Sequence, residues 1–321
     1  MHFLTRIKRR FLVSAPISFL IRKSKFVFLP GFKGIPLFDV IRFFFSQSRK
    51  TGFTERASSI AFNFTMAIPP AVIFLFTLIP YIPISEQFIQ QMFGLIRDVV
   101  PGESNNQRMI GFLNDILNKP RTGLLSLGFL LAMFFSSNAV MGIMRSFDKN
   151  YLGFVKRTGL QQRWVAIRLT MLLFIIFFAS ILSLIMQGAV LRWLGVKNAT
   201  FIAVVHNLRW LVIVLLYFFA ISFIYRYAPA VHKRWKFVNP GSILATFLMI
   251  LFTAVFSYYV SNFSNYNELY GSISTLLILM LLIFFNSLVL LIGFELNVSI
   301  NSLKHEVDER TRLLSGGHHG H

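Results

Sequence analysis

Long runs of apolar residues dominate the chain and predict membrane-spanning helices. About 20 apolar residues in a helix cross a hydrocarbon core of ~30 Å. Six runs of that length occur with little charge inside them, at residues 57–82, 123–146, 168–192, 206–227, 240–261 and 272–298. The pattern therefore predicts an all-α polytopic membrane protein, with about six transmembrane helices in a membrane domain at 57–302 and additional amphipathic surface helices.

The N-terminal segment, residues 1–56, is basic, and part of it is amphipathic. Between Leu37 and Ser46, four phenylalanines surround Asp39 and Arg42. A helix with an apolar face and a few charges lies flat in the membrane interface. We therefore expect this segment to be cytoplasmic and interfacial, with one short helix on the inner membrane surface.

Two further segments lie outside the predicted spans. Residues 84–120 carry two apolar stripes at helical spacing, separated by Pro101 and Gly102. This pattern predicts a pair of short helices on the outer side of the membrane. Residues 303–321 end in the low-complexity sequence GGHHGH, and we expect this tail to be cytoplasmic and disordered.

The positions of the lysines and arginines predict how the bundle is oriented. Basic residues close to the ends of spans are retained in the cytoplasm. The segments on the N-terminal side of the membrane hold 25 of the 32 Lys and Arg residues, and the segments on the opposite side hold the other seven. Both termini are therefore predicted to be cytoplasmic.

Composition agrees with a membrane location and limits the partners. Hydrophobic residues make up 55% of the 321 residues and charged residues only 14%, which leaves too little polar surface to cover a water-soluble globule. The net charge of +20 is distributed over loops and the N-terminal segment. Membrane lipids with anionic headgroups are therefore the expected partners, and nucleic acid is not required to explain the charge.

The sequence contains no motif for catalysis, metal binding or cofactor binding. It has no cysteine and no HExxH, GxSxG, Walker A or GxGxxG motif. The histidines before the tail are His2, His206, His232 and His305, which are scattered over both sides of the predicted bundle. We therefore predict no catalytic residue, no metal and no cofactor.

Glu295 is the one acidic residue inside a predicted span. It lies ~35 Å along its helix, at the cytoplasmic interface. Two interpretations are open. The carboxylate either reaches interfacial water or pairs locally, or it joins Arg56, Arg145 and Arg168, which begin or end other spans at the same depth. In the second interpretation these four residues form a charged gate or a ring that binds a lipid headgroup.

Amide side chains form a second polar group at membrane depth. Asn63 lies in the first span, Asn138 in the second, and Asn286 and Asn297 in the sixth. On a helical wheel Asn286 and Asn297 share one face, whereas Glu295 points the opposite way. The amides either support close helix packing, together with rows of small residues, or line a polar translocation path. The same small residues permit a dimer as well as a monomer, so the oligomeric state stays open.

Pro69 and Pro70 lie inside the first predicted span. Each proline lacks the amide N–H that would continue the helical hydrogen bonds. A proline pair in mid-span predicts a kink or a break at membrane depth. This feature is either a structural bend or the hinge of a transport site.

Three stretches resemble the YihY/BrkB family, namely ERASSIAFNFTMAIPP at 55–70, SSNAVMGIMRSFDKNY at 136–151 and LYGSISTLLILMLLIFFNSLVLLIGFELN at 269–297. The resemblance depends most on Tyr270–Ser272 and Gly293–Asn297. Members of this family are bacterial inner-membrane proteins that are also catalogued as ribonuclease BN-like. The resemblance implies six spans, location in the bacterial inner membrane and a role at the cell envelope, but no defined reaction.

Two functional hypotheses follow. The first is a transporter or flippase that moves a lipid or another envelope compound, with anionic headgroups favoured. The second is a non-enzymatic scaffold that binds an envelope protein through the outer helix pair at 84–120. A ribonuclease is disfavoured, because phosphodiester cleavage needs a metal-binding carboxylate cluster or a placed acid–base pair, and the sequence shows neither.

Overall fold

A computed structural model provides the structure of the chain. It describes residues 22–48, 52–81, 122–148, 154–155, 157–193, 199–232, 234–263 and 273–316, with six further positions between 90 and 115. The elements are α3 (Leu37–Ser48), α4 (Phe53–Leu78), η1 (Ile79–Tyr81), α7 (Thr122–Phe147), α8 (Gly159–Trp193), α9 (Ala199–Tyr227), α10 (Pro240–Phe263) and α12 (Ile273–Gly316).

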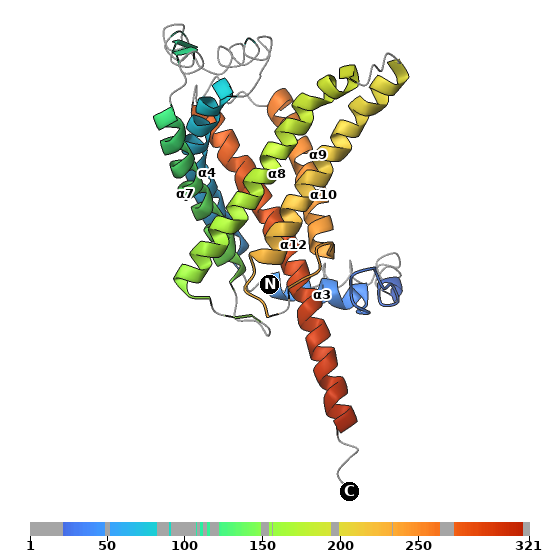
Figure 1. Cartoon of the computed structure of the whole chain (residues 1–321). Coiled ribbons are helices and arrows are strands. Elements are labelled where there is room, and N and C mark those ends of the chain that lie inside the picture. The colour runs from blue at the N-terminus through green and yellow to red at the C-terminus, as the bar shows by residue number, and fades with distance from the viewer. Residues whose placement is uncertain are drawn as a thin grey trace.

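Six long helices, α4, α7, α8, α9, α10 and α12, form a closed ring (Figure 1). Each helix packs against the next one in the sequence, and α12 closes the ring by packing against α4. Large apolar side chains such as Leu130, Ile175 and Phe247 point away from the protein. A helix that is apolar on nearly all sides suits a lipid environment, so the outer surface of the ring fits a bilayer.

One end of the ring is closed by a packed core. We call this end of the ring the basic end, because basic segments flank it. The helices α4, α8 and α10 start at the basic end, and α7 and α9 finish there. Buried apolar residues from all six helices meet in this core. The rings of Phe147 and Phe294 stack with their centroids 3.9 Å apart, and both side chains are fully buried. Toward the other end α8 and α9 diverge from α4 and α7 (Figure 1).

The six predicted spans correspond to the six long helices. Among the described residues, five helices are long and apolar enough to cross a membrane, and α9 contributes a shorter apolar helix over Leu211–Tyr227. The largest difference at a helix start is in α8, which begins at Gly159 rather than at residue 168. The prediction of an all-α polytopic membrane protein is confirmed.

The C-terminal tail differs from the prediction. α12 continues to Gly316 and projects beyond the basic end (Figure 1). Ion pairs between residues one helical turn apart stabilise this extension, with 2.8 Å between Lys304 and Asp308 and 2.8 Å between Glu306 and Arg310. The expectation of a disordered tail over 303–321 is therefore wrong as far as residue 316, and the remainder lies outside the described residues.

The predicted helix in the N-terminal segment is present as α3, which lies across α12 at the basic end (Figure 1). Val40 of α3 packs with Phe32, Ile35 and Ile300 in a small apolar core. α3 is therefore held against α12 by apolar contacts, and its amphipathic sequence also suits a membrane surface.

α4 runs without interruption through Pro69 and Pro70. The helix is therefore not broken here, because the turns on both sides of the proline pair remain helical, and a kink at this position stays a prediction. The predicted outer helix pair at 84–120 lies almost entirely outside the described residues.

Candidate functional site

A buried polar cluster surrounds the start of α10. The side-chain oxygen of Asn239 accepts a hydrogen bond from the backbone N–H of Ser242 at 2.8 Å, and the Asn239 N–H donates to the Ser242 hydroxyl at 3.3 Å. This reciprocal cap, followed by Pro240 in the first helical turn, is a strong start signal for a helix. Both Asn239 and Ser242 are buried, so the cap satisfies polar groups that water does not reach.

Asn297 of α12 completes this cap from a second helix. Its Oδ1 accepts a hydrogen bond from the Gly241 N–H at 2.9 Å, and its Nδ2 donates to Asn239 Oδ1 at 2.6 Å. Asn297 is buried, with only 2% of the residue exposed. The first N–H groups of a helix have no partner within that helix, and Asn297 provides one. This predicted site residue is therefore a link between α10 and α12.

α10 and α12 approach each other closely at two glycines. A Cβ atom on Gly241 would lie 2.1 Å from the carbonyl oxygen of Gly293, and a Cβ atom on Gly293 would lie 2.4 Å from the Tyr225 hydroxyl. The fully buried Tyr225 of α9 donates from its hydroxyl to the Leu290 carbonyl at 2.6 Å. Three helices therefore meet at Gly293, inside the stretch that carries the family resemblance.

Glu295 is completely enclosed, with 0% of its surface exposed. α12 continues past this level, and α3, α4 and α10 all pack against α12, so the carboxylate lies inside the protein. The interpretation of Glu295 as a carboxylate that reaches interfacial water is therefore wrong. Glu295 and Arg56 each have an interaction partner in the fold.

The arginines of the predicted ring lie in different environments. Arg56 is half-buried and its two terminal nitrogens are enclosed, whereas Arg145 and Arg168 are exposed. Arg168 lines a pocket between α8 and α9 whose other charged residues are Arg157 and Arg234. Arg145 and Arg168 are therefore exposed while Glu295 is enclosed, and a common charged ring of these four residues stays a prediction.

Asn63 and Asn138 take part in contacts between neighbouring helices. Asn63 donates to the Ser59 carbonyl of its own helix at 2.7 Å, and its side chain lies against Gly142 of α7. Asn138 of α7 accepts a hydrogen bond from the guanidinium of Arg163 of α8. These contacts agree with the packing interpretation of the two amides.

Asn286 is placed differently from Asn297, although both were predicted on one face of the sixth span. Its Nδ2 donates to the Leu282 carbonyl at 3.0 Å and is 3.5 Å from the Thr253 hydroxyl. Its Oδ1 is buried and has no hydrogen-bond partner among the described residues. Asn297, at the basic end, therefore forms hydrogen bonds through both its oxygen and its nitrogen, whereas Asn286, at mid-depth, forms them through its nitrogen alone within the described part of the chain.

Arg157 caps the end of α9, a role that the sequence pattern does not indicate. Its guanidinium donates to the carbonyl oxygens of Tyr227 at 3.3 Å, Ala228 at 2.9 Å and Pro229 at 3.0 Å. Carbonyl groups at the end of a helix lack partners within the helix. The loop between α7 and α8 is thereby fixed to the end of α9.

An apolar cavity of about 280 Å³ lies at mid-depth between α4, α7 and α8. Ala67 and Ala71, which bracket the proline pair, form part of its wall, and Ser136 and Thr170 are its polar lining residues. The Thr170 hydroxyl donates to the Ala166 carbonyl of its own helix at 2.8 Å. The wall also contains five aromatic rings, those of Phe64, Phe74, Phe174, Phe177 and Phe178.

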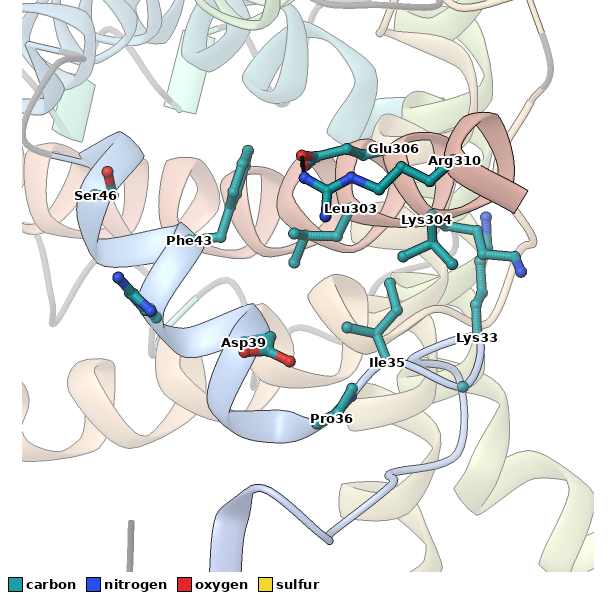
Figure 2. A pocket seen from close by; sticks show the side chains of 13 residues that line it. Lys33, Ile35, Pro36, Asp39, Phe43, Ser46, Leu303, Lys304, Glu306 and Arg310 are labelled. Carbon is teal, nitrogen blue, oxygen red and sulfur yellow. Dashed lines mark hydrogen bonds and ion pairs between the residues drawn. The ribbon is translucent and has the colours of Figure 1, made fainter. Parts of the chain in front are cut away.

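A second cavity, of about 630 Å³, lies between α3 and the extension of α12 (Figure 2). Its charged lining residues are of both signs, namely Lys33, Asp39, Arg42, Lys304, Glu306 and Arg310. Figure 2 shows the Glu306 carboxylate facing the Arg310 guanidinium, at 2.8 Å. The basic groups that line this cavity therefore have acidic groups beside them in the same lining.

The ring of apolar helices, with its polar links gathered at one end, defines a polytopic α-helical membrane protein. The sequence profile of the family described as Virulence factor BrkB matches residues 44–313. The chain belongs to this family, and the resemblance to the YihY/BrkB family is confirmed. The matched region includes α4 through most of α12.

Two relatives illustrate how far the likeness extends. A protein named putative ribonuclease-like protein YfkH, from Bacillus subtilis (strain 168), is 28% identical over 259 residues, which are 79% of this chain and 92% of that protein. A protein named UPF0761 membrane protein, from Xanthomonas campestris pv. campestris (strain 8004), is 34% identical over 99 residues, which are 31% of this chain and 23% of that protein. No solved structure matches the chain.

Proposed function

We propose that this protein is a transporter or flippase that moves a lipid, or another envelope compound with an apolar part, across the bacterial inner membrane. The observation that carries the proposal is the apolar cavity of about 280 Å³ between α4, α7 and α8. Cavities that bind small molecules are mostly apolar and contain a few polar groups. Phenylalanine rings and two hydroxyls at membrane depth suit an acyl chain better than an ion.

The asymmetry of the bundle supports the same proposal. A buried core closes the basic end, while α8 and α9 diverge from α4 and α7 toward the opposite end (Figure 1). Alternating access requires states that are closed on one side of the membrane at a time. Because residues on both sides of Pro69 and Pro70 line the cavity, a bend at the proline pair would change its shape.

The basic end is cytoplasmic in this proposal, because 25 of the 32 Lys and Arg residues lie on the N-terminal side of the predicted bundle. Anionic headgroups are the favoured cargo, since basic residues at the inner surface attract them. The sequence contains no nucleotide-binding motif, so movement by this chain is passive or coupled to an ion.

Filling the cavity is expected to slow lipid movement. In Ala71→Phe the added ring would occupy space that the cargo needs, and we expect the rate to fall about tenfold or more, equivalent to ~1.4 kcal/mol in the barrier. The rate is measured as transbilayer movement of a fluorescent lipid in liposomes that contain the purified full chain.

Ala254→Phe is the matched control, because Ala254 is exposed on α10 and does not line the cavity. The control is expected to keep the wild-type rate. If Ala71→Phe and Ala254→Phe move lipid equally well, the cavity is not the route of the cargo.

We infer further that the chain does not cleave RNA, although one relative has a ribonuclease-like name. Among the described residues, no group of three or more His, Asp or Glu side chains is placed to hold a metal ion. Purified protein incubated with RNA and Mg²⁺ or Mn²⁺ is expected to give no more cleavage than a mock purification. Metal-dependent cleavage that follows the protein through purification would overturn this inference.

A further inference from the structure

A pocket of about 280 Å³ lies between α8 and α9 at the basic end. Its charged lining residues are Arg157, Arg168 and Arg234, and no acidic residue lines it. The rest of its wall comes from Tyr227 and three aliphatic residues of α8, namely Val165, Leu169 and Leu172. The pocket therefore combines three cations with an apolar wall.

The three arginines are held by different parts of the fold. The guanidinium of Arg157 is fixed by its bonds to the carbonyls at the end of α9. That of Arg234 lies over the ring of Tyr227, 5.0 Å from its centroid, which is a favourable cation–π contact. Arg168 projects from α8 and is exposed. The donors of Arg168 and Arg234 are thus available to a ligand.

The charges of Arg168 and Arg234 are not balanced by an ion pair within the described part of the protein, whereas Arg157 lies near the carboxylate of Asp148. Burial lowers the pKa of Arg157, the nearby Asp148 opposes this, and the like charge of Arg234 adds to the lowering. Guanidinium groups remain charged at neutral pH, so their mutual repulsion persists until an anion binds.

The cavity between α3 and α12 provides an internal comparison. Its basic residues are accompanied by Asp39 and Glu306 (Figure 2), and Arg310 is already paired with Glu306. An anion would gain little from entering that cavity. The pocket between α8 and α9 is different because all its charges have one sign.

The position of the pocket indicates that its ligand is a lipid. A neighbouring surface hollow shares Val165 and Arg168 with the pocket and is also lined by Trp164. Trp164 is 57% exposed, and exposed tryptophans lie at the headgroup level of a bilayer. From Arg168 the aliphatic wall continues along α8 to Leu172, which is where the first part of an acyl chain would lie.

We propose that this pocket binds the phosphate group of an anionic phospholipid, with Arg168 and Arg234 donating to the phosphate oxygens and Arg157 contributing charge. Arginine is well suited to this role, because its planar fork matches phosphate oxygens. The inference concerns binding, and it holds whether or not the bound lipid is moved across the membrane. Binding without accelerated lipid movement would leave it intact and count against the transport proposal alone.

The test compares binding of phosphatidylglycerol and phosphatidylcholine to the full-length protein in a neutral detergent. We expect the wild-type protein to prefer phosphatidylglycerol, and the double variant Arg168→Gln/Arg234→Gln to bind it at least about tenfold more weakly. The matched control is Arg22→Gln/Arg42→Gln, which removes the same charge from exposed positions outside the pocket. The control is expected to retain wild-type affinity.

Inorganic phosphate is the second probe, because it offers the same chemistry without acyl chains. We expect it to compete only weakly with phosphatidylglycerol. Competition as strong as that of the lipid would overturn the lipid assignment in favour of a soluble phosphate ligand. If the two double variants lose the same affinity for phosphatidylglycerol, or if neither loses any, this pocket is not the binding site. If the pocket double variant has a lowered melting temperature, Arg168→Gln alone replaces it, since an exposed helical position tolerates this change.

Discussion

Replacing Gly241 by alanine is expected to destabilise the folded protein by about 1–3 kcal/mol. The new Cβ would lie 2.1 Å from the backbone carbonyl oxygen of Gly293, and a backbone atom of another helix cannot turn aside as a flexible side chain can. α10 and α12 would have to separate, which would also stretch the bond between the Gly241 N–H and Asn297. The free energy of unfolding in detergent, or the melting temperature, measures the effect.

Gly123→Ala is the control for this substitution. Gly123 is also in a membrane helix, but a Cβ atom there would meet nothing within 4 Å. Alanine has the higher helix propensity, so we expect Gly123→Ala to leave the stability unchanged or to raise it slightly. Equal stability of Gly241→Ala and the wild-type protein would show that α10 and α12 are not in close contact at this point.

Replacing Asn297 by leucine is expected to cost about 1–3 kcal/mol of stability. The Gly241 N–H would lose its acceptor and Asn239 Oδ1 would lose a donor, and both groups are buried. An unsatisfied buried polar group carries its full desolvation cost. The measurement is again the unfolding free energy of the purified protein in detergent.

Asn286→Leu provides the comparison within the same helix. The Oδ1 of Asn286 is buried and lacks a hydrogen-bond partner among the described groups, so removing the amide relieves a cost. We expect Asn286→Leu to be neutral or stabilising. If the two leucine variants lose the same stability, the hydrogen bonds of Asn297 to the start of α10 contribute nothing specific.

The number and type of the long helices could be predicted from the sequence, because spans of the required length leave an unmistakable hydropathy signal. The start of α8 was less predictable. The residues from Gly159 to Ile167 include Gln161, Gln162 and Arg163, which obscure an apolar run but do not prevent a helix. A hydropathy pattern detects the apolar part of α8 that lies in the bilayer, but α8 begins earlier, in residues suited to the membrane interface.

The extension of α12 was missed although the sequence contains a signal for it. Oppositely charged residues four positions apart, such as Glu306 and Arg310, stabilise an exposed helix, and this pair is formed. The low-complexity sequence is confined to the last six residues, and the part of the tail before it is helical. In this tail the spacing of opposite charges indicates the observed structure better than low complexity does.

The candidate site could be predicted only in part. Asn297 and Glu295 were recognised as polar residues inside a span, but their burial depends on α3 and α10 packing around α12, which no single segment reveals. The roles of Arg157 and Arg234 arise from loops that fold back on the end of α9. The carbonyl groups that Arg157 binds lie 70 to 72 residues further along the chain, and contacts between such distant segments leave no local pattern to detect.

The most direct test of transport is the rate at which labelled lipids cross the bilayer of liposomes that contain the purified wild-type protein. One anionic and one zwitterionic label are compared with protein-free liposomes of the same composition. We expect faster crossing with the protein, greater acceleration for the anionic label, and loss of the acceleration in Ala71→Phe. Rates equal to those of protein-free liposomes for every label would contradict transport and leave the scaffold hypothesis, with a partner bound at 84–120, as the better explanation.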